Sequence, residues 1–499
     1  MKKIFFILIF SSCVFVHVDA QNRDTVIVNF TADSTYQTIQ NFGASDAWSA
    51  QFVGNWPDAK KNAIADLLFS MDTSPEGNPK GIGLSLWRYN IGAGSAEQKD
   101  KSGIKDEWRR AALTTGNDIK VKAQNWFLQA AQKRGVKQFL GFMNSPPVMF
   151  TKNNRAFADK GICNLDSSQY AAFANYTVQA IQQIKKQTGI SLNYISPINE
   201  PQWNWSDGGQ EGCPYSNVEV ASVIKAFNNA LQRKSIRTKL LITESGNLKY
   251  LLPADDKQDK DNQVNDFFSA SSPLYVGNLS NITNAIAAHS YFTTSPFDKA
   301  IALRSAIKDA IAKNKSLEYW QSEYCILGDN AGEINGEKRD LGMDAALYLA
   351  KVLYVDLVYA NASAWQWWLA ISPYNYKDGL IYIDKNETDG NYYDSKMLWA
   401  FGNYSRFVRP GMKRIKLNTN AAELYASGFI DEGKRTTVLI FVNASENERP
   451  IKLTGNLTTT NKTITAYTTN TTKSLEKKLV TVNNLTIPAK SVVTLLYEQ

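Results

Sequence analysis

Residues 192–205 read Leu-Asn-Tyr-Ile-Ser-Pro-Ile-Asn-Glu-Pro-Gln-Trp-Asn-Trp, and this stretch is the most informative part of the chain. Its first half is apolar, which is typical of a buried strand, and the apolar run closes with Asn199 and Glu200. A carboxylic acid at the last residue of a buried strand lies where loops meet solvent. Trp203 and Trp205 follow at once and offer flat rings on which sugar rings stack. The stretch predicts a strand that carries an acid to a surface site.

The same strand-like pattern recurs through residues 40–410, where short apolar runs alternate with longer amphipathic ones. Eight such units are present, and eight close naturally into a (β/α)8 TIM barrel. An open doubly wound sheet is the structural alternative, but its glycine-rich phosphate loop is missing after the first predicted strand. The predicted strands end at residues 41–44, 84–88, 139–143, 195–200, 240–244, 286–289, 319–323 and 364–367.

Helical periodicity fills the segments between these strands. Residues 168–189 repeat apolar side chains every three or four positions, with Ser167 or Ser168 as the expected N-cap and Gly189 as the stop. Residues 343–360 are apolar nearly all round, which predicts a well-buried helix.

The two ends of the chain predict a second part. Residues 411–499 are rich in Thr, Val, Ile and Asn and contain strand-like runs but no good helix, which indicates a small β-sandwich. Residues 21–39 contain a lone strand, which we expect to pair with that C-terminal sheet. The Thr- and Asn-rich segment 458–472 predicts a turn region. The barrel of residues 40–410 would therefore carry an attached sandwich built from both termini.

Residues 1–20 have the features of a secretory signal peptide: two lysines, an apolar run at 4–10 and small residues at 18–20. The mature chain is therefore expected to be exported, to the periplasm, the cell surface or the medium. A lipid anchor at Cys13 is an alternative, which the apolar residues after it disfavour. No later run approaches the roughly 20 apolar residues of a membrane helix, so no integral membrane segment is expected in the mature chain.

The charge pattern excludes a nucleic-acid partner. The formal net charge is +8, but lysine and arginine are spread along the chain without a basic block or a nucleic-acid-binding motif. Aromatic residues make up 12% of the chain and offer flat faces of the kind that sugar sites use, although most of the tryptophans are expected to fill the core or the surface. A poly- or oligosaccharide substrate is expected, and a monomer is favoured.

Cysteine and histidine are scarce. Beyond the signal segment the cysteines are Cys163, Cys213 and Cys325, and the only histidine is His289. Cys163 and Cys213 fall in long loops and could form a disulfide in an oxidising compartment, whereas Cys325 has the surroundings of a buried thiol. The spacing does not match a zinc site, and one histidine excludes a multi-histidine metal site. We therefore expect no metal and no cofactor.

Two glutamates provide the candidate chemistry. Glu200 ends the fourth predicted strand and Glu323 the seventh, and these strand ends face each other across a barrel mouth. Retaining glycosidases use two carboxyl groups about 5–5.5 Å apart, one as nucleophile and one as acid and then base. Either glutamate alone could be an ordinary strand-end carboxylate. The pair within an eight-unit barrel predicts cleavage of a glycosidic bond by double displacement.

The chain also resembles glycoside hydrolase family 30, within clan A. The segments that carry the resemblance are residues 41–48, 83–95, 144–147, 198–203 and 406–411. It spans nearly the whole mature chain, including the sandwich. The resemblance implies that Glu200 is the general acid/base and Glu323 the nucleophile.

The resemblance implies further substrate-binding roles. Asn199 would hold the sugar 2-hydroxyl, Arg88 would orient the carboxylates, and Asp46 would bind hydroxyls of the sugar at the cleavage point. His289 and Tyr291 match the family's sixth-strand pattern, although His289 alone could equally be a satisfied core histidine.

Chemically, Arg88 can favour an ionised Glu323, while Glu200 needs a raised pKa to stay protonated until it donates. Glu244, Glu318 and Asp378 are further carboxylates for which a surface or structural role is expected.

Tryptophans are expected to wall the cleft. Trp367 and Trp368 end the eighth predicted strand, and neighbouring strand residues face opposite ways, so only one of them can point at substrate. We expect Trp203 and Trp367 to contact the sugar.

Within the family, the surroundings of Trp48 and residues 94–97 most resemble the endo-β-1,6-galactanase branch. This implies an endo-acting enzyme on β-1,6-linked galactan, such as the side chains of arabinogalactan proteins. A β-1,6-glucanase, a xylanase or a fucosidase are alternatives in the same family, and a noncatalytic glycan-binding protein is the alternative from another class. Residues 147–149 and Ser290 depart from the glucosylceramidase-like pattern and disfavour that substrate.

Overall fold

The computed structural model describes residues 25–254, 256–328, 330–455 and 463–498. The expected signal segment, with Cys13, lies outside these residues, as does part of the expected turn region at 458–472. Within the described residues, no helix combines the length and the apolar character that crossing a bilayer requires.

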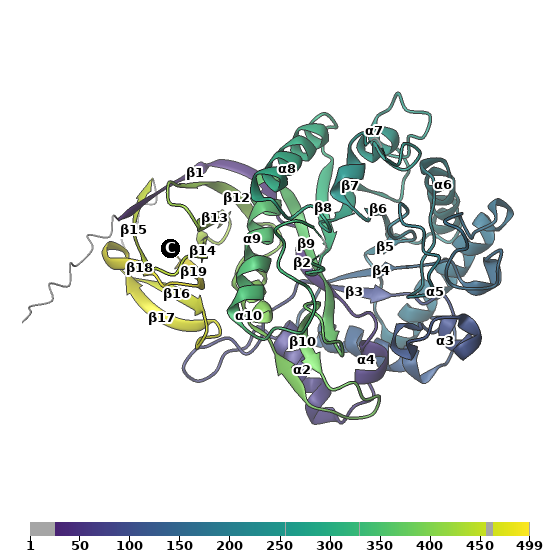
Figure 1. Ribbon diagram of the computed structural model, residues 1–499, viewed down its shortest axis with the longest axis horizontal. Coiled ribbons are helices and arrows are strands. Elements are labelled where there is room, and N and C mark those ends of the chain that lie inside the picture. The colour runs from purple at the N-terminus through teal and green to yellow at the C-terminus, as the bar shows by residue number, and fades with distance from the viewer. Residues whose placement is uncertain (1–24, 255, 329, 456–462, 499) are drawn as a thin grey trace, which may run out of the picture.

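Eight parallel strands close into a barrel, as predicted (Figure 1). Closure comes from the last strand, β9, which pairs with both the first barrel strand, β2, and its predecessor, β8. The barrel strands are β2 (Asn41–Ser45), β3 (Leu86–Asn90), β4 (Gln138–Phe142), β5 (Tyr194–Ser196), β6 (Lys239–Ser245), β7 (Ile282–His289), β8 (Glu318–Glu323) and β9 (Ala362–Ser372), and β10 (Gly379–Ile383) and β11 (Tyr392–Asp394) extend the sheet beyond β9.

Helices follow the strands around the outside of the barrel. The α-helices are α1 (Ala50–Val53), α2 (Asp58–Phe69), α3 (Ser95–Gln98), α4 (Ile119–Lys133), α5 (Tyr170–Thr188), α6 (Asn217–Arg233), α7 (Gln263–Phe268), α8 (Phe297–Ala312), α9 (Met343–Tyr359) and α10 (Lys396–Ser405). Short 3-10 turns are η1 (Lys99–Ser102), η2 (Glu107–Arg109), η3 (Val148–Phe150), η4 (Ser167–Gln169), η5 (Leu248–Leu251) and η6 (Val482–Asn484).

Two helices test the periodicity argument in detail. Helix α9 coincides with the apolar segment and is buried along most of its length. Helix α5 ends as expected at Gly189, whose φ of +79° suits glycine. Its start differs, because the 3-10 turn η4 precedes it and Asp166, not a serine, accepts the capping hydrogen bond from the Ser168 amide.

Strand β5 is shorter than predicted. It ends at Ser196, so Glu200 does not close the strand but lies four residues beyond it, in irregular backbone. Pro197 follows Ser196 and has no amide hydrogen with which to continue the ladder. The acid therefore reaches the barrel mouth on a loop.

The remaining strands form a nine-stranded sheet in the order β17-β16-β19-β14-β13-β12-β1-β15-β18. The N-terminal strand β1 lies inside it, antiparallel to β12 and parallel to β15. Residues from both ends of the sheet share one apolar core, which makes the sheet a two-layered sandwich. The strands are β1 (Val26–Thr38), β12 (Lys413–Thr419), β13 (Leu424–Asp431), β14 (Thr436–Asn443), β15 (Arg449–Gly455), β16 (Thr463–Thr469), β17 (Glu476–Thr481), β18 (Leu485–Ile487) and β19 (Ser491–Glu498).

Helices α9 and α10 join the two parts, lying between the sandwich and the barrel strands (Figure 1). From α10, Asn403 donates hydrogen bonds to the Tyr467 carbonyl and the Thr494 hydroxyl of the sandwich. At the end of the same helix, Arg406 donates to the carbonyls of Ser70 and Gly81 in the barrel. The interface is thus both apolar and hydrogen-bonded.

Candidate active site

A cavity of about 1010 Å³ opens beyond the carboxyl ends of the barrel strands. One wall is the loop after β5, and the opposite wall comes from the segments after β8 and β9. The lining residues are Trp48, Arg109, Glu200, Trp203, Asn204, Trp205, Ser206, Asp207, Gln210, Tyr291, Phe292, Glu323, Cys325, Leu327, Trp368, Tyr374, Asn375, Tyr376 and Asp378. This is the face of a TIM barrel where active sites are found.

Glu200 and Glu323 both line this cavity and come close together. A carboxylate oxygen from each, together with a ring nitrogen of His289, all lie within 4.8 Å of one another. The two side chains are 8% and 5% exposed, so both carboxyl groups are largely buried at the edge of the cavity. That separation agrees with the spacing of a retaining pair, which is about 5–5.5 Å.

The backbone at Glu200 is fixed in an uncommon conformation. Its φ is +45°, in the left-handed region that residues other than glycine seldom adopt. The Glu200 amide donates to the carbonyl of Glu244 at 2.8 Å, and its own carbonyl accepts from the Trp205 indole at 3.1 Å. Backbone strain of this kind clusters at functional sites, where surrounding bonds over-determine the geometry.

Glu323 is held by two donors. Arg88 Nη1 lies 2.5 Å from Glu323 Oε2, and the Tyr291 hydroxyl donates to Oε1 at 3.1 Å. Arg88 is fully buried and lies over the Phe142 ring, 4.1 Å from its centroid. Burial alone would lower the pKa of Arg88, but Glu244 and Glu323 raise it above its usual value. The guanidinium therefore stays charged and keeps Glu323 positioned.

His289 bridges two carboxyl groups. Its Nδ1 lies 2.8 Å from Glu200 Oε1 and its Nε2 lies 3.1 Å from Glu244 Oε2. Burial alone would lower the pKa of His289, but the charges of Glu323, Glu200 and Glu244 raise it to about 10. The ring is therefore hydrogen-bonded on both sides and carries a proton readily.

The ionised state of Glu244 determines which atoms donate along the hydrogen-bonded series Glu244, His289 and Glu200. Burial would raise its pKa, but Arg88 and His289 lower it to about 2, so it is ionised at neutral pH and can only accept. His289 Nε2 must then donate to it. Burial raises the pKa of Glu200, against the lowering effect of His289. His289 Nδ1 and Glu200 Oε1 lie 2.8 Å apart, so a proton can pass between them.

Glu244 was expected to be structural or exposed, and the structure makes it the buried hub behind the site. Besides Arg88 at 3.4 Å and His289, it accepts hydrogen bonds from Ser196 and Ser322. Its sequence signal was available, because it ends an apolar run just as Glu323 does.

Asp46 and Asn199 lie behind the cavity wall. Asp46 is buried, accepts from the Asn90 amide at 2.8 Å and from Gln124 at 3.1 Å, and does not line the cavity. Burial raises the pKa of Asp46 to about 7. Asn199 is also buried, and its side-chain oxygen has no hydrogen-bond partner among the described residues.

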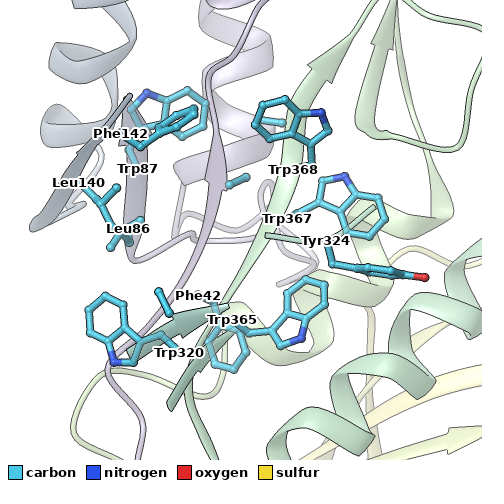
Figure 2. Packing of buried hydrophobic residues seen from close by; sticks show 14 of the residues in the cluster. Phe42, Leu86, Trp87, Leu140, Phe142, Trp320, Tyr324, Trp365, Trp367 and Trp368 are labelled. Carbon is cyan, nitrogen blue, oxygen red and sulfur yellow. The ribbon is translucent and has the colours of Figure 1, made fainter. Parts of the chain in front are cut away.

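Trp367 does not line the cavity, so the prediction that it contacts substrate is wrong. Trp367 is fully buried, stacks beside Trp365 with centroids 6.2 Å apart, and donates its indole N–H to the Asp378 carbonyl (Figure 2). Its neighbour Trp368 lines the cavity instead and packs edge-on against Trp48. Trp203 lines the cavity as expected.

The predicted disulfide is not formed in the structure. Cys163 and Cys213 are both free and buried, and each thiol donates to a backbone carbonyl, Cys163 to Leu165 and Cys213 to Pro214, both at 3.6 Å. The Asn164 amide also donates to the Cys213 sulfur at 3.4 Å. The two loops therefore meet at this pair of cysteines, both of which are free thiols in the structure.

Glu200, His289 and Glu323 are spaced closely enough to hold a metal ion. Their existing contacts favour a different role. Arg88 already supplies a positive charge to Glu323, and both nitrogens of His289 are engaged by carboxylates. Such a donor set suits proton transfer better than cation binding.

Several wall residues were not predicted as site residues, because loops place them there. Arg109 reaches the cavity from η2 and lies 5.0 Å from the Trp48 ring centroid and 5.1 Å from that of Tyr374. Asp378, expected to be structural, lines the same wall. No local pattern marks either residue, because their positions depend on loop conformation.

Comparison with known proteins gives matches over most of the chain. The model of O-Glycosyl hydrolase family 30 matches residues 24–382. An endo-β-1,6-galactanase from Hypocrea rufa is 24% identical over 432 residues, covering 82% of this chain and 79% of the relative. Glucuronoxylanase XynC from Bacillus subtilis (strain 168) is 23% identical over 362 residues, covering 69% of this chain and 71% of the relative.

A solved structure is also similar over nearly the whole length. It is that of a conserved exported protein from Bacteroides fragilis, with a TM-score of 0.86, 32% identity, and coverage of 94% of this chain and 100% of that chain. Together with the match over most of the barrel, these findings place the chain in O-glycosyl hydrolase family 30.

Proposed function

We propose that the protein is an exported, retaining endo-glycosidase that hydrolyses β-1,6-linked galactan by double displacement. The observation that carries the mechanism is the close approach of Glu200 and Glu323 within one cavity at the barrel mouth. The similar Hypocrea rufa protein, an endo-β-1,6-galactanase, supports the choice of substrate.

In the first step, Glu323 attacks the anomeric carbon while Glu200 protonates the departing glycosidic oxygen. Arg88 and Tyr291 hold the attacking carboxylate with its oxygens fixed by hydrogen bonds. The bond to the leaving sugar breaks, and a covalent glycosyl ester on Glu323 forms. The leaving sugar departs with the proton of Glu200.

In the second step, water enters on the side that the leaving sugar vacated. Glu200, now ionised, takes a proton from this water, and the resulting oxygen nucleophile attacks the anomeric carbon. The ester bond to Glu323 breaks and the carboxylate is regenerated. Two displacements return the original anomeric configuration.

His289 and Glu244 set the protonation of Glu200 in this proposal. A proton that passes between His289 and Glu200 lets Glu200 act as an acid in one step and as a base in the next. Asn199 is proposed to accept from the sugar 2-hydroxyl through its unpartnered oxygen, and Asp46 to act through Arg88 and the loop beside it.

The shape of the cavity supports action within a chain. Its volume, about 1010 Å³, is at the upper end of the range of about 300–1,000 Å³ for small-molecule sites. Half-buried Trp203, which packs edge-on against Phe292, offers an aromatic face on the side of the acid, and Trp368 offers one on the side of the nucleophile. Sugars can therefore be held on both sides of the bond that breaks.

Export is proposed from the signal-like residues 1–20. The similar protein from Bacteroides fragilis is named an exported protein, which supports the same location.

The test uses the mature chain, residues 21–499, with β-1,6-galactan, β-1,6-glucan and xylan. We expect oligosaccharide release from galactan and the loss of that release in Glu323→Gln, with thermal unfolding close to unchanged. Release mainly from glucan or xylan would replace galactan as the assigned substrate. Binding without release by the wild type would identify a noncatalytic glycan-binding protein.

A further inference from the structure

Asp378 is a carboxylate of the cavity wall that the proposed mechanism does not use. It lies in the segment between β9 and β10, and its position is fixed from behind, since its backbone carbonyl accepts the Trp367 indole N–H at 2.7 Å. The residue is 8% exposed and lines the cavity. Its backbone is thus a rigid support for the side chain.

The carboxyl group of Asp378 is incompletely paired. Its Oδ1 has no hydrogen-bond partner in the described parts of the chain. Burial raises the pKa of Asp378 to about 7, and Arg109 lowers it only weakly. A buried carboxyl oxygen without a partner is costly, so its retention calls for an explanation.

Asp378 lies near the nucleophile rather than near the acid. Its charge acts on Cys325, which is two residues beyond Glu323 and lines the cavity. Trp368 and Tyr374 belong to the same wall, while the loop that follows Glu200 forms the other. Asp378 therefore lies on the Glu323 side of the cavity.

We propose that Asp378 is a substrate-binding residue whose carboxyl group accepts a hydrogen bond from a hydroxyl of the sugar on the Glu323 side of the scissile bond. The assignment rests on the proposed function and adds a residue that selects the sugar. A site that pairs its own polar group with a substrate hydroxyl rejects analogues lacking that hydroxyl, because the group is then left buried and unpaired. The aromatic rings beside it supply the apolar contact.

The test measures binding apart from turnover. In the Glu323→Gln background, the dissociation constant of a β-1,6-linked galacto-oligosaccharide is measured by calorimetry with and without Asp378→Ala. We expect Asp378→Ala to weaken binding by about tenfold, as the loss of one buried hydrogen bond implies. Asp378→Asn keeps an acceptor oxygen and should weaken binding less than Asp378→Ala.

The control is Asp344→Ala, which removes an exposed carboxylate from the first turn of α9, outside the cavity. Its dissociation constant should match that of the parent within about twofold. Equal binding by the parent and a folded Asp378→Ala protein would overturn the assignment.

A second measurement keeps the native Asp378. A crystal structure of Glu323→Gln with the oligosaccharide should place a sugar hydroxyl within hydrogen-bond distance of the Asp378 carboxyl, and a ligand that leaves it unpaired overturns the assignment. If wild-type protein favours another glycan of the panel, that glycan becomes the probe. Failure of the galactanase proposal is thus seen in the wild type, and failure of the Asp378 proposal in the variants.

Discussion

At the scale of single residues, charge placement controls the site. Glu244 never reaches the cavity, yet it holds Arg88 and His289, which in turn contact Glu323 and Glu200. A strand-end carboxylate pattern predicted the two cavity glutamates. The same pattern could not predict that Glu244 lies behind the cavity, because this depends on the direction in which its side chain leaves the strand end.

Replacing Glu244 tests this control. Glu244→Gln removes the charge that keeps a proton on His289 Nε2, so the proton that can pass to Glu200 becomes less available. We expect kcat/KM to fall by at least about tenfold and its pH optimum to move, while Ser222→Ala on exposed α6 surface should leave both unchanged. An unaltered pH profile in a folded Glu244→Gln protein would contradict the proton-control role.

Glu244→Gln should also change how the stability of the protein depends on pH. The pKa of Glu244 lies at about 2 in the folded protein and is lowered from 4.5, so its ionised form stabilises the fold above about pH 4.5. That contribution is lost as pH falls toward 2. The shift amounts to about 3 kcal/mol at neutral pH. Thermal unfolding of wild type and Glu244→Gln should therefore differ at pH 7 and converge as the pH falls from 4.5 toward 2.

At the scale of elements, strand β9 explains why one tryptophan was misassigned. Alternation on the strand was predicted correctly, so that only one of Trp367 and Trp368 faces the cavity. Which one depends on a bulge against β2, where Ala44 pairs with Trp367 but Ser45 pairs with Leu369. A bulge of this kind shifts the faces of a strand, and it has no signal in the sequence of either strand.

The two tryptophans should therefore respond differently to truncation. Trp367→Ala opens a hole in packed core and should cost about 3–5 kcal/mol of stability. Trp368→Ala removes a cavity ring and should mainly raise KM while destabilising less. Chemical denaturation and initial-rate kinetics on both variants separate these effects. The assignment fails if Trp367→Ala is the variant that raises KM at unchanged stability.

At the scale of the whole molecule, the sandwich is built from chain segments that precede and follow the barrel in the sequence. Strand β1, from the N-terminal side of the barrel, pairs with β12 and β15 from its C-terminal side, and α10 is bonded to both parts. The strand-rich C-terminal composition predicted the sandwich. The hydrogen bonds of Asn403 and Arg406 across the interface could not be predicted, because they join residues far apart in sequence.

This arrangement predicts one cooperative unfolding transition. Calorimetry of residues 21–499 should give a single peak, and a chain truncated after residue 410 should be insoluble or unfolded because β1 loses both partners. Two separate peaks, or a stable truncated barrel, would contradict the shared-core description.

The central claim is a double displacement through Glu323 and Glu200. The most direct measurement follows the anomeric proton of the newly formed reducing end by NMR in the first minutes of hydrolysis, before mutarotation. The account predicts the β-anomer as the initial product, with the configuration of the substrate retained. An initial α-anomer would mean a single displacement and would contradict it.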